Sequence, residues 1–245
     1  MAQPAPLYIV ASPRPRIGKT LIARLLMEFL RASDRPLVGF DLNPREPELA
    51  DRFPNLVWPI DIGATRGQME LFDRLIAESA STKIIDLGYA PFEQFFAVMA
   101  EIGFAQEARR RGIEPTVLFV ADPAEANVRS YGELRQRSAA TFVPVYNESA
   151  SLLFDDRDFP PTRPEYGVIH IPRLSPLVRG VIDRPNFSFN AYMAKLSGGP
   201  TEVHQWIGTI YAEFRDFELR LLMGKLSASL GGGAFASKHE GRRAR

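Results

Sequence analysis

The sequence predicts an α/β fold, with a mostly parallel sheet and helices on both of its faces. Short apolar runs alternate with segments in which apolar residues recur at helical spacing, along most of the 245 residues. Several strand candidates end in a polar residue or run into a polar loop. In open parallel sheets, ligands bind beyond the carboxyl ends of the strands, so these positions are the first candidates for a site.

The elements follow one another in a regular order. Strands are expected over residues 7–10, 36–41, 55–62, 82–87, 115–122, 140–146 and 167–172. Helices are expected over 21–31, 67–79, 91–111, 125–137 and 201–226, with a short helical turn within 45–53. Pro59 favours an edge or end position for its strand. Residues 149–166 are expected to be irregular, and 173–200 show no clear pattern.

The composition excludes several classes of protein. Hydrophobic residues make up 45% of the chain and charged residues 24%, which is typical of a globular protein, and the net charge is +1. Without cysteine, disulfides, zinc–thiolate sites and clusters held by the chain's own thiolates are excluded. No signal peptide and no stretch of about 18 apolar residues is recognised, so we expect a cytoplasmic protein without a transmembrane segment.

The domain organisation is expected to be simple. No linker divides residues 1–230, which we interpret as one nucleotide-binding domain. Gly231-Gly232-Gly233 opens a polar tail over 231–245, expected to be disordered. Its arginines, Arg242, Arg243 and Arg245, are candidate contacts for DNA or acidic lipid, although a solvated basic tail is commoner.

The stretch 7–25 has the organisation of a phosphate-binding loop. An apolar strand leads through a loop to Gly18-Lys19-Thr20 and then to a helix. Backbone N–H groups at the start of such a helix face an anion, and the helix dipole favours negative charge there. Lys19 would reach the terminal phosphates and the Thr20 hydroxyl would hold Mg²⁺.

The loop departs from the usual pattern. Pro13 stands where the usual spacing has glycine, and Pro13 and Pro15 lack backbone N–H donors. Arg14 and Arg16 offer guanidinium donors in their place. The alternative is a basic turn before an ordinary helix, which the preceding strand and the following helix make the weaker interpretation.

In element order, residues 5 to 225 resemble the P-loop ATPases of the ParA/MinD group, which includes the nitrogenase iron protein, dethiobiotin synthetase and the cobyrinate amidation enzymes. The resemblance implies a SIMIBI-type three-layer sandwich that binds ATP or ADP with Mg²⁺ and forms a nucleotide-dependent homodimer. The group's loop reads K-G-G-x-G-K-[ST], and its first lysine aligns with Arg14. That lysine touches the partner's phosphates across the dimer, so Arg14 is expected to do the same. The phosphate contacts would come from Arg16, Ile17, Gly18, Lys19, Thr20 and Leu21.

Residues after later strands resemble further motifs of the group. Asp41-Leu42-Asn43-Pro44 is similar to its D-x-D-P segment, which implies that Asp41 lies near the Mg²⁺ shell. Asn43 replaces the aspartate that positions the attacking water; an amide orients a water but cannot act as a base, so slow hydrolysis is expected. Asp86 resembles the Mg²⁺-binding strand end. The resemblance places Asn147 and Pro172 at the purine base, while an ordinary turn explains Asn43 or Asn147 equally simply.

Three functions remain open. The first is an ATP–Mg²⁺-dependent dimeric switch with weak ATPase activity, acting in partitioning or positioning with an unknown protein partner, DNA or a cargo. The second is an ATP-dependent synthetase that activates a small molecule bound in the 149–200 region. The third is a degenerate interaction module without nucleotide, for which Pro13, Pro15 and Asn43 are the signs of decay.

Overall fold

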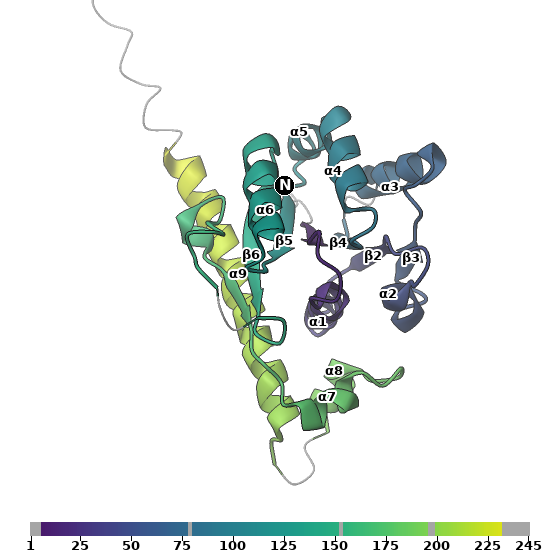
Figure 1. Ribbon diagram of the computed structural model, residues 1–245, viewed down its shortest axis with the longest axis vertical. Coiled ribbons are helices and arrows are strands. Elements are labelled where there is room, and N and C mark those ends of the chain that lie inside the picture. The colour runs from purple at the N-terminus through teal and green to yellow at the C-terminus, as the bar shows by residue number, and fades with distance from the viewer. Residues whose placement is uncertain (1–5, 78–79, 152–153, 196–198, 232–245) are drawn as a thin grey trace, which may run out of the picture.

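The computed structural model describes residues 6–77, 80–151, 154–195 and 199–231 (Figure 1). The strands are β1 (Leu7–Ala11), β2 (Leu37–Asp41), β3 (Val57–Pro59), β4 (Thr82–Asp86), β5 (Pro115–Val120), β6 (Thr141–Asn147) and β7 (Ile169–Ile171). The helices are α1 (Lys19–Arg31), α2 (Glu48–Arg52), α3 (Thr65–Ala77), α4 (Phe92–Glu101), α5 (Phe104–Arg110), α6 (Glu125–Arg137), α7 (Pro176–Ile182), α8 (Phe189–Met193) and α9 (Glu202–Gly231), with a 3₁₀ turn η1 (Pro164–Tyr166).

The strands form one seven-stranded sheet in the order β3-β2-β4-β1-β5-β6-β7. All pairings within it are parallel, which confirms the predicted fold class. Pro59 ends β3, and β3 is an edge strand, as its proline predicted. The chain leaves β1 first towards β2 and later towards β5 on the other side. The carboxyl end of β1 is therefore the point where the strand order reverses, the usual place for a ligand in such a sheet.

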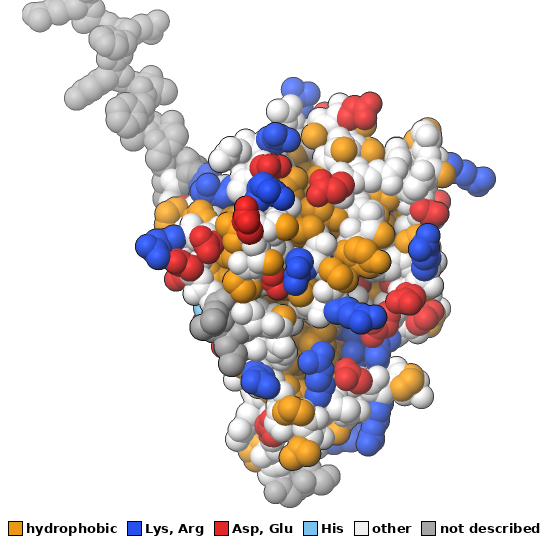
Figure 2. Space-filling model, in the orientation of Figure 1, with side chains coloured by type: hydrophobic (Ala, Val, Ile, Leu, Met, Phe, Trp, Pro, Cys, Tyr) orange, Lys and Arg blue, Asp and Glu red, His pale blue; other side chains and the backbone are white. Residues whose placement is uncertain are grey.

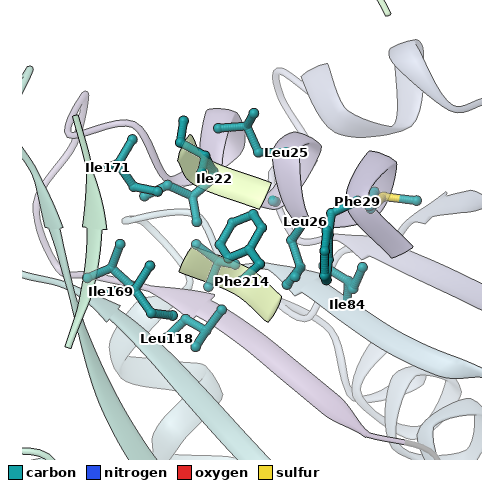
Figure 3. Packing of buried hydrophobic residues seen from close by; sticks show 14 of the residues in the cluster. Ile22, Leu25, Leu26, Phe29, Ile84, Leu118, Ile169, Ile171 and Phe214 are labelled. Carbon is teal, nitrogen blue, oxygen red and sulfur yellow. The ribbon is translucent and has the colours of Figure 1, made fainter. Parts of the chain in front are cut away.

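Helices cover both faces of the sheet and make three layers. Alternate residues of β1 point to opposite faces: Tyr8 and Val10 join a core with α1, α2, α8 and α9, and Leu7 and Ile9 join one with α3, α4, α5 and α6. In Figure 3 the side chains of α1 meet Phe214 of α9 above the strands. The labelled residues of that packing are Ile22, Leu25, Leu26, Phe29, Ile84, Leu118, Ile169, Ile171 and Phe214. Helix α1, which follows the predicted phosphate-binding loop, is thus fixed between the sheet and α9.

Two regions differ from the sequence prediction. The helix expected over 91–111 is two helices, because Gly103 adopts a left-handed conformation (φ 60°) between α4 and α5. Glycine takes this conformation without steric cost and lets the chain turn so that Phe104 is buried. The unassigned region 173–200 contains α7 and α8, each started by a serine whose hydroxyl accepts a backbone N–H: Ser175 for α7 and Ser188 for α8.

Helix α9 is longer than predicted. It runs to Gly231, five residues beyond the expected end at Leu226 and into the first residue of the expected tail. Leu222, which the helical spacing of apolar residues in 201–226 predicts to be buried, is 39% exposed. The remaining tail, 232–245 with its arginines, lies outside the described residues. Within the described chain, no helix has both the length and the apolar character that crossing a bilayer requires.

Candidate functional site

The candidate site lies at the carboxyl end of β1, where the loop 12–18 connects that strand to α1. Gly18 is the N-cap residue of α1 and is left-handed, with φ 91°. Arg16 is also left-handed, with φ 59°, which costs a non-glycine residue on the order of 1 kcal/mol or more. A loop with this backbone persists only where surrounding groups determine its shape. Two sets of side chains, one from β6 and one from α6, do so.

Asn147, at the end of β6, packs directly on the loop. Its Nδ2 donates a hydrogen bond to the Ile17 carbonyl at 2.8 Å, and its Oδ1 accepts one from the Ser149 N–H at 3.1 Å. A β carbon on Gly18 would lie 2.4 Å from Asn147 Nδ2. The sequence placed Asn147 at a purine base. The structure shows its amide against the loop 12–18, with one N–H and one oxygen lone pair not used by these bonds.

A second set of contacts reaches the loop from the start of α6. Asn127, fully buried, donates from Nδ2 to Ser12 Oγ at 2.8 Å and accepts the Asp122 N–H at 2.9 Å. Ser12 Oγ also accepts the Arg14 N–H at 3.4 Å. The Arg14 guanidinium Nε lies 3.6 Å from Asp122 Oδ1. Sequence reasoning missed Ser12, Asp122 and Asn127 as site residues. The available signal was that Asp122 ends the strand predicted over 115–122, as Asp86 lies near the end of the strand predicted over 82–87.

Lys19 lies under the loop. Only 8% of it is exposed, and its ammonium donates a hydrogen bond to the Arg14 carbonyl. Burial lowers the pKa of Lys19 to about 8, and the negative charge of Asp86 opposes that change. The ammonium is thus held inside the loop, where it is poorly solvated and available to a group of negative charge.

Asp86, the last residue of β4, is fully buried, and neither of its carboxylate oxygens has a hydrogen-bond partner among the described residues. Burial and the neighbouring charge of Asp41 raise the pKa of Asp86 to about 7. Thr20 and Lys19 act in the opposite direction, although the Thr20 hydroxyl makes no well-formed hydrogen bond to it. A buried carboxylate without partners is costly, so this group is suited to a cation that is bound only part of the time.

Asp41, opposite Asp86 in the β2–β4 pairing, differs from it because its carboxylate is hydrogen-bonded. Its Oδ1 accepts the backbone N–H and the side-chain Nδ2 of Asn43, both at 3.0 Å. Its Oδ2 accepts the N–H groups of Leu49 and Ala50, at 2.9 and 3.2 Å, and so caps the start of α2. Burial raises the pKa of Asp41, and these hydrogen bonds oppose the rise. All four lone-pair sites are used, so Asp41 acts on a nearby cation through its charge.

Asn43 is fixed between two neighbours. Its Nδ2 is bonded to Asp41, and a β carbon on Gly88 would lie 2.0 Å from its Oδ1. The amide carbonyl of Asn43 therefore faces the backbone at Gly88, two residues after Asp86 at the end of β4.

The remaining predicted residues lie around the loop. The Arg14 side chain is 48% exposed at the rim, and Arg16 is exposed. Leu21, in the first turn of α1, packs its side chain partly against the core shared by α1 and α9. The Pro172 carbonyl, after β7, accepts the Trp206 Nε1–H at 2.7 Å.

The donor set fits a magnesium ion that keeps most of its waters. No cluster of three or more His, Asp or Glu side chains suited to a metal occurs in the described ranges, so a fully protein-ligated ion is not indicated there. Mg²⁺ bound with a nucleotide takes few protein ligands. Thr20 would supply a hydroxyl, and the partnerless Asp86 carboxylate would accept hydrogen bonds from the metal's water.

Comparison with known proteins supports the fold. The chain is similar to the solved structure of a MinD cell division protein from Aquifex aeolicus, with a TM-score of 0.53 and 14% sequence identity, over 90% of this chain and 97% of that one. No family model and no curated protein matches the sequence. The structure thus has the three-layer architecture of P-loop nucleotide-binding proteins, at a sequence identity that shows the fold alone.

Proposed function

We propose that this protein is a nucleotide-dependent switch of the ParA/MinD type, which binds ATP with Mg²⁺ and hydrolyses it slowly. The observation that carries the proposal is the fully buried Asp86 carboxylate, without a hydrogen-bond partner, beside Lys19 and Thr20. A Mg²⁺–triphosphate would supply both the positive charge that Asp86 lacks and the negative charge that Lys19 lacks.

The phosphates would bind along residues 16–21. Lys19 would exchange its bond to the Arg14 carbonyl for the terminal phosphates, and backbone N–H groups from Arg16 to Leu21 would face the rest. Pro13 and Pro15 offer no N–H, and Arg16 is free to supply a guanidinium at the exposed side. Asn147 and Pro172 would border the base, Asn147 through its remaining N–H and lone pair.

Slow hydrolysis is proposed because of Asn43. Its carbonyl faces the backbone after β4, so the amide would orient a water beside the terminal phosphate. It cannot take the proton of that water. Catalysis would then depend on positioning and on charge neutralisation by Lys19, Mg²⁺ and Arg14.

The switch would be a homodimer that forms over the nucleotide. Arg14 lies at the rim with its side chain half exposed and its guanidinium 3.6 Å from Asp122, a position from which it would reach a partner's phosphates. A role in positioning or partitioning is proposed from the MinD-like fold. Figure 2 shows basic and acidic side chains intermixed over one face of the protein. The net charge of the chain, +1, gives no overall basic field for DNA, so the proposal favours a protein partner.

The test is thermal stability with Mg²⁺–ATP, Mg²⁺–ADP and no ligand. Ligand at about 100 times its dissociation constant stabilises the folded state by about 2.7 kcal/mol, a shift of several degrees. We expect this shift in wild type and in the control Lys195→Ala, an exposed lysine, and its loss in Lys19→Ala. Equal shifts in wild type and Lys19→Ala would contradict the site.

Dimerisation is measured separately, by light scattering with a slowly hydrolysed ATP analogue. We expect a dimer in wild type and a monomer in Arg14→Ala, with nucleotide binding retained. ATP consumption that requires an added metabolite would instead indicate the synthetase. No thermal shift with any nucleotide would indicate an interaction module.

A further inference from the structure

We propose that Asn127 is a positioning residue for the phosphate loop, which it holds through the Ser12 hydroxyl in place of the backbone geometry that glycines usually provide. The inference rests on the proposed function in one respect only, that the ligand is a nucleotide. The Asn127 side chain is buried and lies 115 positions from Ser12 in the sequence.

The loop needs an external support because of its own composition. It contains two prolines, and Arg16 is left-handed without being glycine. Its internal backbone bonds do not account for this shape, since among the described residues the backbone hydrogen bond at the end of the loop, from the Ile22 N–H to the Gly18 carbonyl, belongs to the helix that follows. A conformation of this kind requires neighbours that exclude the alternatives.

Asn127 provides such a support at the start of the loop. It is fully buried, and both ends of its amide are engaged: Nδ2 with Ser12 Oγ at 2.8 Å and Oδ1 with the Asp122 N–H at 2.9 Å. Ser12 is itself fully buried, and its hydroxyl in turn accepts the Arg14 N–H. The bond therefore joins the first turn of α6 to the residue after β1, across 115 positions of the chain.

The second hydrogen bond of Asn127, to the Asp122 N–H, affects the side chain of Arg14. The Asp122 carboxylate accepts the Ala124 N–H at 2.9 Å, which fixes it at the start of α6, and lies 3.6 Å from the Arg14 guanidinium. Asn127 orients Asp122 through the backbone N–H. A single amide thus sets both the backbone position of Arg14, through Ser12, and the place of its charged partner. Because the Arg14 carbonyl is also the acceptor for Lys19, the position of the phosphate-binding lysine depends on the same amide.

The experiment compares Asn127→Ala, Ser12→Ala and the double variant with wild type, by hydrogen exchange of the loop and by nucleotide affinity. The matched control is Asn190→Ala, which removes an amide bonded to the Glu28 carbonyl and to the Tyr211 hydroxyl, away from the loop. We expect Asn127→Ala to speed exchange of the 12–19 amides without ligand, and to weaken Mg²⁺–ATP binding roughly five- to tenfold. Asn190→Ala should change neither quantity.

The double variant separates positioning from general loss of packing. If the amide acts through Ser12, the loss of affinity in the double variant is smaller than the sum of the two single losses, because the bond between Asn127 and Ser12 is removed in each single variant.

The outcomes distinguish this inference from the proposed function. Unchanged loop exchange in Asn127→Ala would overturn the inference, whatever the nucleotide affinity. Additive losses in the double variant would overturn it as well, because they assign the effect to packing. Faster loop exchange in a protein whose wild type binds no nucleotide would support the positioning of the loop and overturn the proposed function.

Discussion

The side-chain nitrogen of Asn147 occupies the space beside Gly18 that a β carbon would need. The separation would be 2.4 Å, and the amide is held in place by its bond to the Ile17 carbonyl. Gly18 is in addition left-handed, at φ 91°. The end of β6 and the start of α1 therefore fit together only with glycine at this position, so the loop 12–18 is part of the packing between these two elements.

The first prediction concerns this contact. Gly18→Ala would force Asn147 away and strain the backbone, so we expect a loss of about 1–3 kcal/mol in stability and loss of the nucleotide-induced thermal shift. The control is Gly132→Ala in α6, where a β carbon would meet nothing within 4 Å. That change should be neutral or should stabilise by up to about 1 kcal/mol. Both are measured by urea denaturation, and equal behaviour of the two variants would contradict the packing described.

The second prediction concerns pH. The pKa of Asp86 is raised from 3.8 in the unfolded chain to about 7 in the folded one, so the folded protein holds the proton more tightly between these values. The contribution of Asp86 to stability is therefore largest below about pH 4 and decreases as the pH rises to 7. Relative to Asp86→Asn, wild type should lose on the order of 1–4 kcal/mol over this range. Urea denaturation without Mg²⁺ or nucleotide measures it, and parallel pH profiles would show that Asp86 does not titrate in this way.

The third prediction concerns Asn43. In Asn43→Asp, the group 3.0 Å from Asp41 Oδ1 changes from a donor to a second carboxylate. We expect the free energy of unfolding to fall by about 1–3 kcal/mol at pH 7. It should recover below about pH 5, as the pair of carboxylates takes up a proton. Asn55→Asp, at an exposed position, adds the same charge as a control and should change stability by less than about 0.5 kcal/mol. A variant as stable as wild type at pH 7 would mean that the 43–44 turn relaxes away from Asp41.

The fourth prediction concerns the link between α2 and α7. Arg52 donates hydrogen bonds to the carbonyls of Asp183, Arg184 and Pro185, at 3.2, 2.9 and 3.3 Å. Arg52→Ala removes three charge-assisted hydrogen bonds. We therefore expect the free energy of unfolding to fall by about 1–3 kcal/mol and hydrogen exchange in α7 to be faster. Arg66→Ala, an exposed arginine of α3, is the control. Unaltered exchange in α7 with Arg52→Ala would show that other contacts hold that helix.

The sequence predicted the strands, and the polar residues at their ends, because a local pattern in the chain reveals both. An apolar run that ends in Asp86, or a glycine before Lys19, is visible in a few consecutive residues. The break at Gly103 was missed because the helical spacing of apolar residues continues across it. The short helices α7 and α8 were missed because five to seven residues show too little periodicity, although Ser175 before Pro176 is a recognisable start.

The partners of the site residues could not be predicted in the same way. Asp41 at a strand end suggested a metal, and only the folded chain brings the N–H groups of Leu49 and Ala50 to its oxygens. Asn127 bonds to Ser12 across 115 positions, a contact that depends on β1 and β5 being neighbours. Residue type and local position indicate which groups are able to act, and the sheet order determines which of them meet.

The bond from Trp206 to the Pro172 carbonyl has a practical consequence. The chain has two tryptophans, and they lie towards opposite edges of the sheet. Trp206 is nearly buried beside the end of β7, whereas Trp58 on β3 is 38% exposed under the Arg74 guanidinium. Their fluorescence spectra should differ, since emission shifts to shorter wavelength as an indole leaves water. A Trp58→Phe protein would therefore carry a single tryptophan, next to the proposed base site, and its emission, excited selectively over that of tyrosine, is expected to report ligand binding without any attached dye.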